Sequence, residues 1–382
     1  MSEKSKTFKI LFTGGGTAGH VYPIIAVVRE LKRISLNANF YYVGPKDEFS
    51  DNLLSQEGIK VKNILTGKIR RYMTFNSLFQ NFIDIIFKIP LGFAQACFFV
   101  FVVNPDFTFS KGGYGSFAAV FWSWFWMSPV FLHESDVIPG AANRLMNKMA
   151  LEIFVAFSVS KTEYFPPKKM ISVGNPIRKE ITEGTKEEAK KLFNLQGGKT
   201  GTLLILGGSQ GAQRINDLIL DILPRLLTDF EVIHQTGEKN FKQVEAESKV
   251  VMTKDSEPYY HPAPFLQENE LKQAYAAADL VISRAGSGAI FEIAGCGKPS
   301  ILIPLANSAQ NHQIKNAYLY HIMGAAKVIE EENLTPGFFL ERIKLLFHRP
   351  EEMNEMRQSA KAFARADSAR IVANYIAEYL KQ

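Results

Sequence analysis

The chain has 382 residues, of which 46% are hydrophobic and 21% are charged. This length allows two domains of ordinary size, and the composition excludes a disordered chain. The formal net charge of +6 comes from an excess of Lys and Arg within the first 170 residues, because the remainder is almost balanced. No nucleic-acid-binding motif appears in the sequence, so a basic and aromatic first half favours an anionic membrane surface or a phosphate-bearing partner.

Cys97 and Cys296 both lie in apolar surroundings and lack the spacing of metal ligands, which predicts buried free thiols. The chain opens on a short polar stretch and goes directly into an apolar strand, so we expect no secretory signal and a reducing cytoplasm. No cluster with metal-ligand spacing is seen, and we expect no bound metal.

Residues 89–105 and 112–132 carry no charge and are nearly long enough to cross a bilayer. Pro and Gly residues interrupt both stretches, which favours buried or interfacial amphipathic helices over membrane spans. Packing in the core is the default explanation for the surplus of phenylalanine nearby, including Phe79, Phe82 and Phe98, and contact with lipid is the alternative for some of them.

The first half alternates between predicted strands and helices. Strands are predicted at residues 8–12, 40–43, 61–65, 107–109, 130–132 and 153–156, and helices at 21–34 and twice within 77–101. Gly14, Gly16 and Gly19 match a G-x-G-x-x-G turn, but the acidic residue that an NAD site needs is not found near Gly44 at the end of the second strand. A dinucleotide site is therefore disfavoured.

Three further turns carry polar residues that suit ligand binding. Residues 66–72 form a basic, aromatic loop that either holds a phosphate or lipid headgroup or is simply solvated. Residues 111–115 form another glycine-rich turn before a helix, and residues 133–136 follow a buried strand. Polar residues after a strand in an alternating α/β chain mark the ligand crevice, although capping of the next helix is the competing interpretation.

The second half repeats the pattern. Strands are predicted at residues 202–206, 231–234, 263–266, 280–282 and 300–305, and helices at 215–227, 289–296, 314–323 and 352–382. The turn at 284–288 opens a helix whose N-terminus suits a phosphate, and Glu292 one turn later is placed to accept two ribose hydroxyls.

These elements predict an α/β protein with two doubly wound, Rossmann-like domains that face one another across a cleft. The predicted domains are residues 1–174, on which a C-terminal helix at about 365–382 packs back, and residues 175–364.

Six motifs in order resemble the MurG family of bacterial cell-wall glycosyltransferases. They lie in residues 13–23, 111–115 with 133–143, 174–178, 207–212, 284–292 and 311–317. The resemblance implies a GT-B fold and inverting transfer of N-acetylglucosamine from UDP-N-acetylglucosamine to the muramoyl 4-hydroxyl of lipid I, which gives lipid II for peptidoglycan. It also implies a peripheral site of action on the cytoplasmic face of the plasma membrane, with no essential metal or cofactor.

By position, the resemblance implies that Glu292 binds the ribose hydroxyls, that the backbone of Leu266 reads uracil and that Gln313 hydrogen-bonds the sugar. Ser209 and Arg178 are expected beside the diphosphate. The remaining residues expected at the donor are Thr17, Ala18, Gly19, Ser287, Gly288 and Ala289. The last three differ from the family's commoner Ala-Leu-Thr, and Ala18 replaces a frequent glycine.

His20 is the expected general base or acceptor-positioning group, because a neutral imidazole takes a hydroxyl proton near pH 7. Capping or packing at a helix start is the alternative role of His20. Asp136 stands where many relatives have Asn, and a carboxylate there either repels an acceptor phosphate or is itself the base. Arg70, Arg71 and Tyr114 are expected to serve the acceptor or the membrane.

Two other functions fit part of the sequence. A UDP-N-acetylglucosamine 2-epimerase of the same fold would share Glu292 but leaves the basic, aromatic first half unexplained; free epimerised sugar would identify it. A non-catalytic membrane scaffold of a split glycosyltransferase would bind donor without transfer, but Ser209, Glu292 and Gln313 on one chain argue against it.

Overall fold

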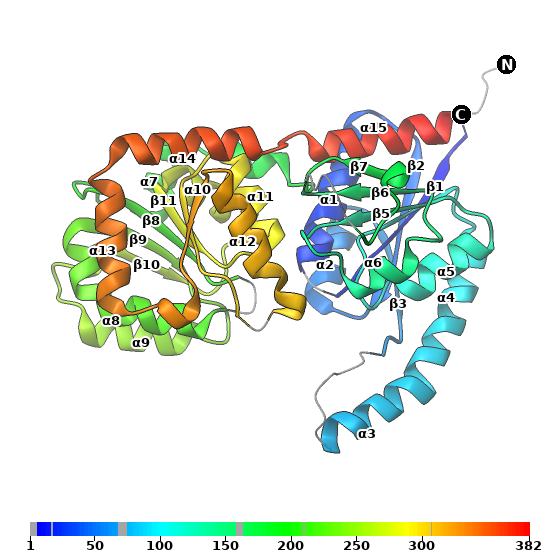
Figure 1. The fold of residues 1–382 in the computed structure, drawn as a ribbon, viewed down its shortest axis with the longest axis horizontal. Coiled ribbons are helices and arrows are strands. Elements are labelled where there is room, and N and C mark those ends of the chain that lie inside the picture. Colours follow the sequence, from blue (N-terminus) through cyan, green and yellow to red (C-terminus); the bar gives the residue numbers. More distant parts are fainter. Residues whose placement is uncertain (1–5, 17, 68–74, 158–162, 209–210, 307) are drawn as a thin grey trace. The chain divides into compact units, whose positions relative to one another are not determined.

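The computed structural model in Figure 1 describes residues 6–16, 18–67, 75–157, 163–208, 211–306 and 308–382. The chain forms two compact units. Unit 1 consists of Met1–Arg178 together with Asp367–Gln382, and unit 2 consists of Lys179–Ala366. The chain therefore passes between the units twice, and its last residues belong with its first.

Unit 1 is built on a seven-stranded sheet with the order β3-β2-β1-β4-β5-β6-β7. The strands are β1 (Phe8–Thr13), β2 (Ala38–Pro45), β3 (Lys60–Ile64), β4 (Phe107–Ser110), β5 (Val130–Glu134), β6 (Glu152–Val155) and β7 (Met170–Ser172). All neighbouring strands are parallel. Both faces of the central strands are buried, which explains continuous apolar runs such as residues 10–12.

Helices cover this sheet (Figure 1). They are α1 (Ala18–Arg33), α2 (Glu48–Gln56), α3 (Phe75–Ile83), the π-helix η1 (Asp84–Lys88), α4 (Ile89–Val103), α5 (Phe117–Phe125), α6 (Ala141–Met146), the short η2 (Pro167–Lys169) and α15 (Ser368–Lys381). The C-terminal α15 packs against α1, and its buried Val372, Ala373 and Ile376 belong to the same core as the central strands.

Helices α3, η1 and α4 follow one another without a break and project from the sheet (Figure 1). The stretch Phe79–Val103 is long and apolar enough to cross a membrane by length and composition, and only 17% of its most apolar window is buried. Phe79, Phe82 and Phe98 are 58%, 57% and 63% exposed. Packing in the core is therefore the wrong explanation for these three phenylalanines.

Helix α4 packs against the rest of unit 1 through small and medium-sized residues. Gly92, Ala96, Val100 and Val103 form its buried face. A Cβ at Gly92 would lie 1.6 Å from the carbonyl oxygen of Leu65, so no other residue fits there without moving the helix. The larger side chains of α4 consequently point outward.

Unit 2 has a six-stranded parallel sheet with the order β10-β9-β8-β11-β12-β13. The strands are β8 (Gly201–Leu206), β9 (Phe230–Gln235), β10 (Tyr260–Ala263), β11 (Leu280–Ser283), β12 (Ser300–Leu302) and β13 (Ala326–Val328). Alternate side chains of β8 enter the hydrophobic clusters on the two faces of the sheet, Leu203 and Ile205 on one and Leu204 and Leu206 on the other.

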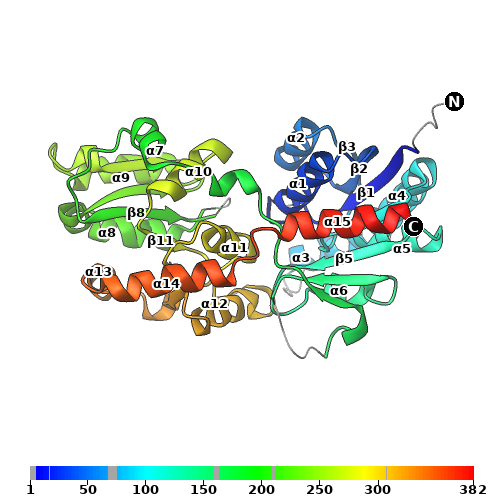
Figure 2. The same ribbon diagram turned by 90° about the horizontal axis from the view of Figure 1, so that it is seen from above.

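The helices of unit 2 cover both faces of the sheet (Figures 1 and 2). They are α7 (Lys186–Phe193), α8 (Gln213–Asp229), α9 (Phe241–Val251), α10 (Glu268–Ala277), α11 (Ser287–Gly295), α12 (His312–Ile322), α13 (Pro336–Phe347) and α14 (Pro350–Phe363), with short helical turns η3 (Lys179–Thr182), η4 (Glu257–Tyr259), η5 (Ala309–Asn311) and η6 (Glu331–Asn333).

Several sequence expectations need correction. The strand predicted at 263–266 is β10 at Tyr260–Ala263, because these earlier residues pair with β9. The strand predicted to reach residue 305 ends at Leu302. The segment predicted to be helical at 352–382 forms two helices, α14 and α15, and the second of them matches the C-terminal helix predicted at about 365–382. Cys97 and Cys296 are free thiols as expected, but both are only partly buried.

Candidate active site

In each unit, the turns that follow the central strands meet at the carboxyl edge of the sheet. In unit 1 the strand order reverses between β1 and β4, and in unit 2 it reverses between β8 and β11. Turns diverge where the order reverses, and ligands of doubly wound sheets bind at such a position.

His20 lies in the first turn of α1, between two glycine turns of unit 1. A Cβ at Gly15 would lie 2.9 Å from Cε1 of this imidazole, and a Cβ at Gly113 would lie 3.2 Å from Nε2. Gly113 also has a φ of +89°, which an L side chain rarely adopts. Glycine at both positions thus lets the imidazole fit closely between the two turns.

The pKa of His20 is lowered to about 4. Burial is the largest cause, the charge of Lys111 adds to it, and the carboxylate of Asp136 opposes it. The imidazole is therefore neutral at pH 7, and a nitrogen that does not carry a proton is able to accept one.

Glu134 holds the turn that carries Asp136. Its Oε1 accepts the backbone N–H of Asp136 at 3.0 Å, and its Oε2 accepts from the N–H of Gly140 at 3.0 Å and from Nδ2 of Asn143 at 2.9 Å. Burial, followed by the charge of Asp136, raises the pKa of Glu134, while these hydrogen bonds lower it. Asp136 itself is partly buried, on the same edge as His20.

The other predicted residues of unit 1 lie in different surroundings. Arg178 is 2% exposed, and its guanidinium carbon lies 3.7 Å from the ring centroid of Tyr22 in α1. Tyr114 is 46% exposed, in the turn before α5, and Gly19 is exposed at the start of α1 beside Ala18. Thr17, Ser209, Arg70 and Arg71 lie outside the described residues.

The start of α11 in unit 2 is open. Gly286 caps the helix with φ −66° and ψ 141°, and Ser287, Gly288 and Ala289 form its first turn. A Cβ at Gly286 or Gly288 would meet no atom within 4 Å. A ligand can therefore approach the backbone N–H groups at this helix N-terminus, where the helix dipole favours an anion. Glu292 is partly buried in the next turn.

Gln235, at the end of β9, joins two turns of this edge and was missed as a site residue from the sequence. Its Oε1 accepts the backbone N–H of Leu266 at 3.1 Å, and its Nε2 donates to the carbonyl oxygen of Gly208 at 3.3 Å. Leu266 is 2% exposed. The N–H of Leu266 is therefore already bonded, so any recognition of a base by this backbone falls to its carbonyl.

Gln313, in the first turn of α12, anchors the segment after β12. Its Oε1 accepts the backbone N–H of Leu305 at 3.0 Å, and its own N–H donates to Oγ of Ser308 at 3.2 Å. Gln310 and Asn311, just before it, have φ of 57° and 54°. Two consecutive left-handed residues other than glycine are strained, which is typical of functional sites.

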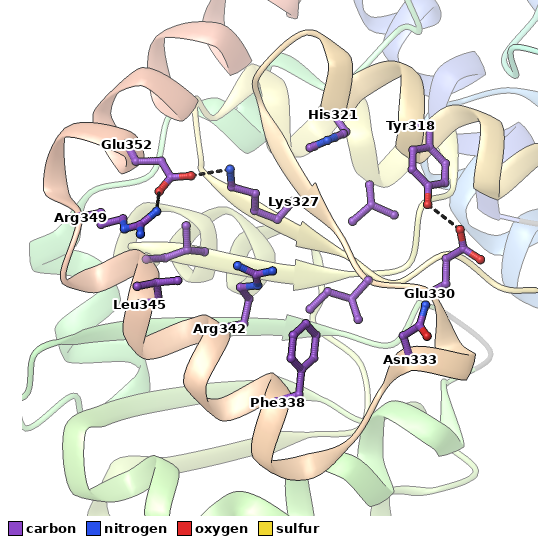
Figure 3. A pocket seen from close by; sticks show the side chains of 13 residues that line it. Tyr318, His321, Lys327, Glu330, Asn333, Phe338, Arg342, Leu345, Arg349 and Glu352 are labelled. Carbon is purple, nitrogen blue, oxygen red and sulfur yellow. Dashed lines mark hydrogen bonds and ion pairs between the residues drawn. The ribbon is translucent and has the colours of Figure 1, made fainter.

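A hollow of about 500 Å³ lies elsewhere in unit 2, between α12, β13, α13 and α14 (Figure 3). Its two carboxylates are engaged. Glu352 pairs with Lys327 and Arg349, and Glu330 accepts a hydrogen bond from Tyr318. None of the residues predicted from the sequence lines this hollow. Among the described residues, no group of three His, Cys, Asp or Glu side chains is arranged to hold a metal ion.

Sequence models of glycosyltransferase family 28 match both halves of the chain, the N-terminal domain over residues 10–155 and the C-terminal domain over residues 202–371. The chain is 33% identical to the UDP-N-acetylglucosamine--N-acetylmuramyl-(pentapeptide) pyrophosphoryl-undecaprenol N-acetylglucosamine transferase of Treponema denticola, over 97% of each chain. It is 34% identical to the transferase of the same name from Shouchella clausii, over 98% of this chain and 99% of the relative.

Solved structures share the fold at lower identity. MurG of Acinetobacter baumannii has a TM-score of 0.71 and 22% identity, over 97% of this chain and 99% of that one. The UDP-GlcNAc 2-epimerase of Neisseria meningitidis, bound to UDP-GlcNAc, has a TM-score of 0.66 and 16% identity, over 97% and 100%. These likenesses show that both units have the Rossmann-like architecture of GT-B proteins.

The motif-bearing turns lie at the carboxyl edges of both sheets, and the transferase relatives match over nearly their whole length. The chain belongs to the family of UDP-N-acetylglucosamine--N-acetylmuramyl-(pentapeptide) pyrophosphoryl-undecaprenol N-acetylglucosamine transferases, the MurG family.

Proposed function

We propose that this chain transfers N-acetylglucosamine from UDP-N-acetylglucosamine to the muramoyl 4-hydroxyl of lipid I and so forms lipid II. The observation that carries the proposal is the match to transferases of this name over 97% or more of the chain. The turns at the two carboxyl edges support it, because they supply a helix N-terminus in unit 2 and a neutral imidazole in unit 1.

Unit 2 holds the donor in this proposal. The N-terminus of α11 receives the diphosphate, Glu292 accepts the ribose hydroxyls, and the carbonyl of Leu266 reads the uracil ring. Gln313 donates from its amide nitrogen to the sugar, since its amide oxygen already accepts from Leu305. The open space at Gly286 and Gly288 supports this placement, because a phosphate can reach the backbone there.

The transfer step forms a bond between the acceptor oxygen and the anomeric carbon and breaks the bond from that carbon to the β-phosphate. UDP leaves with the electron pair, and the hydroxyl proton passes to the base. Negative charge grows on the β-phosphate, where the helix N-terminus and the glycine-turn amides stabilise it in place of a metal ion.

His20 is the proposed base, because burial keeps its imidazole unprotonated at neutral pH. Asp136 is close enough to influence the pKa of His20 and is the competing base. The variants His20→Ala and Asp136→Asn distinguish which of the two residues takes the proton.

The exposed apolar surface of α3, α4 and α5 is proposed to contact the membrane that holds the acceptor, on the cytoplasmic face. Phe125, Trp126 and Met127 at the end of α5 are 52%, 42% and 90% exposed, beyond the phenylalanines of the projecting helix. Apolar surface of this extent is unusual on a monomeric soluble protein and marks an interaction site.

The first experiment is transfer of labelled N-acetylglucosamine from its UDP donor to a lipid I analogue, with and without a chelator of divalent metal ions. We expect equal amounts of lipid II product in both samples, because protein groups stabilise the leaving diphosphate. Free epimerised sugar without acceptor, or tight donor binding without transfer, would overturn the proposed reaction. Loss of product with the chelator alone would overturn only the proposed metal independence.

Replacing Glu292 by Ala should weaken UDP binding by roughly 10²- to 10⁴-fold, since two hydrogen bonds to a charged group are lost. Calorimetry measures the affinity, and Glu341→Ala on the exposed face of α13 is the matched control. UDP that lacks both ribose hydroxyls should bind wild type and Glu292→Ala equally well. Unchanged affinity for UDP in Glu292→Ala would exclude the ribose assignment.

Replacing His20 by Ala should lower kcat by about 10²- to 10⁴-fold and leave the KM for the donor unchanged. Because the pKa is lowered to about 4, the unprotonated base persists below pH 6.5, and activity is lost only as the pH falls toward 4. We therefore expect kcat/KM of the wild type to stay level from pH 6.5 to 5.5. Near-normal turnover in His20→Ala, with a large loss in Asp136→Asn, would make Asp136 the base.

Replacing Phe79, Phe82 and Phe98 together by Ser should reduce binding to anionic vesicles by more than about tenfold, because buried phenylalanines contribute roughly 2 kcal/mol each. Vesicle flotation measures binding. All three tryptophans, residues 122, 124 and 126, lie on or beside α5, so their fluorescence checks that unit 1 is folded. Phe338→Ser in unit 2 is the matched exposed control, and full binding by the triple variant would refute membrane contact through this helix.

A further inference from the structure

Lys111, the first residue after β4, is a buried cation that the proposed transfer leaves without a role. It is 3% exposed. Its Nζ lies 2.7 Å from Nδ1 of His133, 2.6 Å from Oγ of Ser135 and 3.0 Å from Oδ1 of Asn175. An ammonium group has three donors and no acceptor, so each donor here has one partner. Lysine is almost never buried this deeply without partners.

These hydrogen bonds connect three separate parts of unit 1. Lys111 follows β4, His133 and Ser135 lie at and after the end of β5, and Asn175 comes after β7. The backbone carbonyl of Asn175 also accepts a hydrogen bond of 2.9 Å from Oγ of Ser368, at the start of α15. The buried ammonium is thus the centre of the polar network on this side of the carboxyl edge.

The partners of His133 determine its tautomer. Nδ1 faces the ammonium of Lys111, which only donates, so Nδ1 is the accepting nitrogen. Nε2 lies 2.9 Å from the carbonyl oxygen of Gly174, which only accepts, so Nε2 carries the proton. Both nitrogens are engaged, and His133 is 0% exposed. The imidazole is therefore held in one orientation and one protonation state.

The charged and titratable groups around Lys111 come from two other elements. Glu134 and Asp136, from the end of β5 and the turn after it, raise the pKa of Lys111, but burial outweighs them and lowers this pKa to about 7. The charge of Lys111 in turn lowers the pKa of His133 and that of His20 in α1. A protonated Lys111 therefore disfavours the protonation of both histidines.

We propose that Lys111 is a positioning residue for the transfer reaction: its ammonium donates to Nδ1 of His133, to Ser135 and to Asn175, and thereby holds the turn at residues 133–136 on the edge where the acceptor reacts. The kinetic part of this inference rests on the proposed function, whereas the hydrogen bond to His133 does not. Glu134 accepts hydrogen bonds from the backbone of the turn itself, whereas Lys111 connects the turn to the end of β4 and to Asn175.

The variants Lys111→Met and Lys111→Gln separate the hydrogen bond from the charge. Met has a similar length and no donor, whereas Gln keeps an amide donor and removes the charge. Protein labelled with ¹⁵N and ¹³C in histidine reports each tautomer by NMR, and His133→Gln assigns the signal. At pH 6, where Lys111 is protonated, we expect the Nε2–H tautomer in all three proteins, because the Gly174 carbonyl still accepts from Nε2. The ¹⁵N resonance of Nδ1 should report an accepted hydrogen bond in wild type and in Lys111→Gln, and should move to the value of a free imidazole nitrogen in Lys111→Met.

Kinetics supply the second readout. Lys111→Met should lower kcat by roughly 100-fold, the usual cost of displacing a reacting group by about 1 Å, and should leave the KM for UDP-N-acetylglucosamine unchanged. Both variants remove a positive charge near His20, so its pKa rises and the acidic loss of kcat/KM moves to higher pH. Lys168→Met, an exposed lysine of the same unit, is the matched control and should behave like wild type.

Tryptophan fluorescence verifies that each variant is folded, and if Lys111→Met fails to fold, Lys111→Gln still tests the effect of the charge on the pH profile. An unchanged Nδ1 resonance of His133 in folded Lys111→Met, or an unchanged pH profile in Lys111→Gln, would overturn the inference. If wild type transfers no sugar but the Nδ1 resonance changes in Lys111→Met, the proposed function fails while the hydrogen bond between Lys111 and His133 stands.

Discussion

Both units depend on the constraint that all their strands are parallel. In such a sheet every strand ends at the same edge, and a helix must return the chain to the opposite edge before the next strand begins. Residues far apart in the sequence, such as His20, Lys111 and His133, therefore meet because each lies just after the end of a strand or at it. The same constraint gathers Gln235, Gln313 and the start of α11 in the second sheet.

Much of this arrangement could be predicted from the sequence, because its signals are local. Continuous apolar runs indicate strands buried on both faces, and glycines mark the turns where the backbone needs a positive φ, as at Gly113 and Gly208. Glu292 and Gln313 were identified from motifs around them, and the structure places both at the carboxyl edge of the second sheet. The expected reaction came from the family resemblance, because the periodicity of apolar residues predicts secondary structure and says nothing about chemistry.

What could not be predicted depends on partners that are distant along the chain. Gln235 hydrogen-bonds to Leu266, 31 residues later, and Lys111 hydrogen-bonds to Asn175, 64 residues later. A short sequence motif cannot reveal either hydrogen bond, because the two partners never lie in the same motif. The position of β10 was misjudged because buried Leu266 looks like a strand residue, whereas the actual strand contains Pro262, which disfavours that prediction. Between α14 and α15 the chain passes from unit 2 to unit 1, a change that helix propensity does not report.

The C-terminal position of α15 has a consequence for how the protein is made. Unit 1 includes Asp367–Gln382, which are translated after the whole of unit 2, so the core of unit 1 is completed only after unit 2 has been made. Unit 2 is continuous, and its 188 residues take about 10 to 40 s to translate at the usual rates. During that interval the apolar side chains of α1 that α15 later contacts are uncovered, and exposed apolar surface of this kind is bound by chaperones. A chain that stops before residue 367 would therefore lack part of the core of its first unit, although all of residues 1–178 had been made.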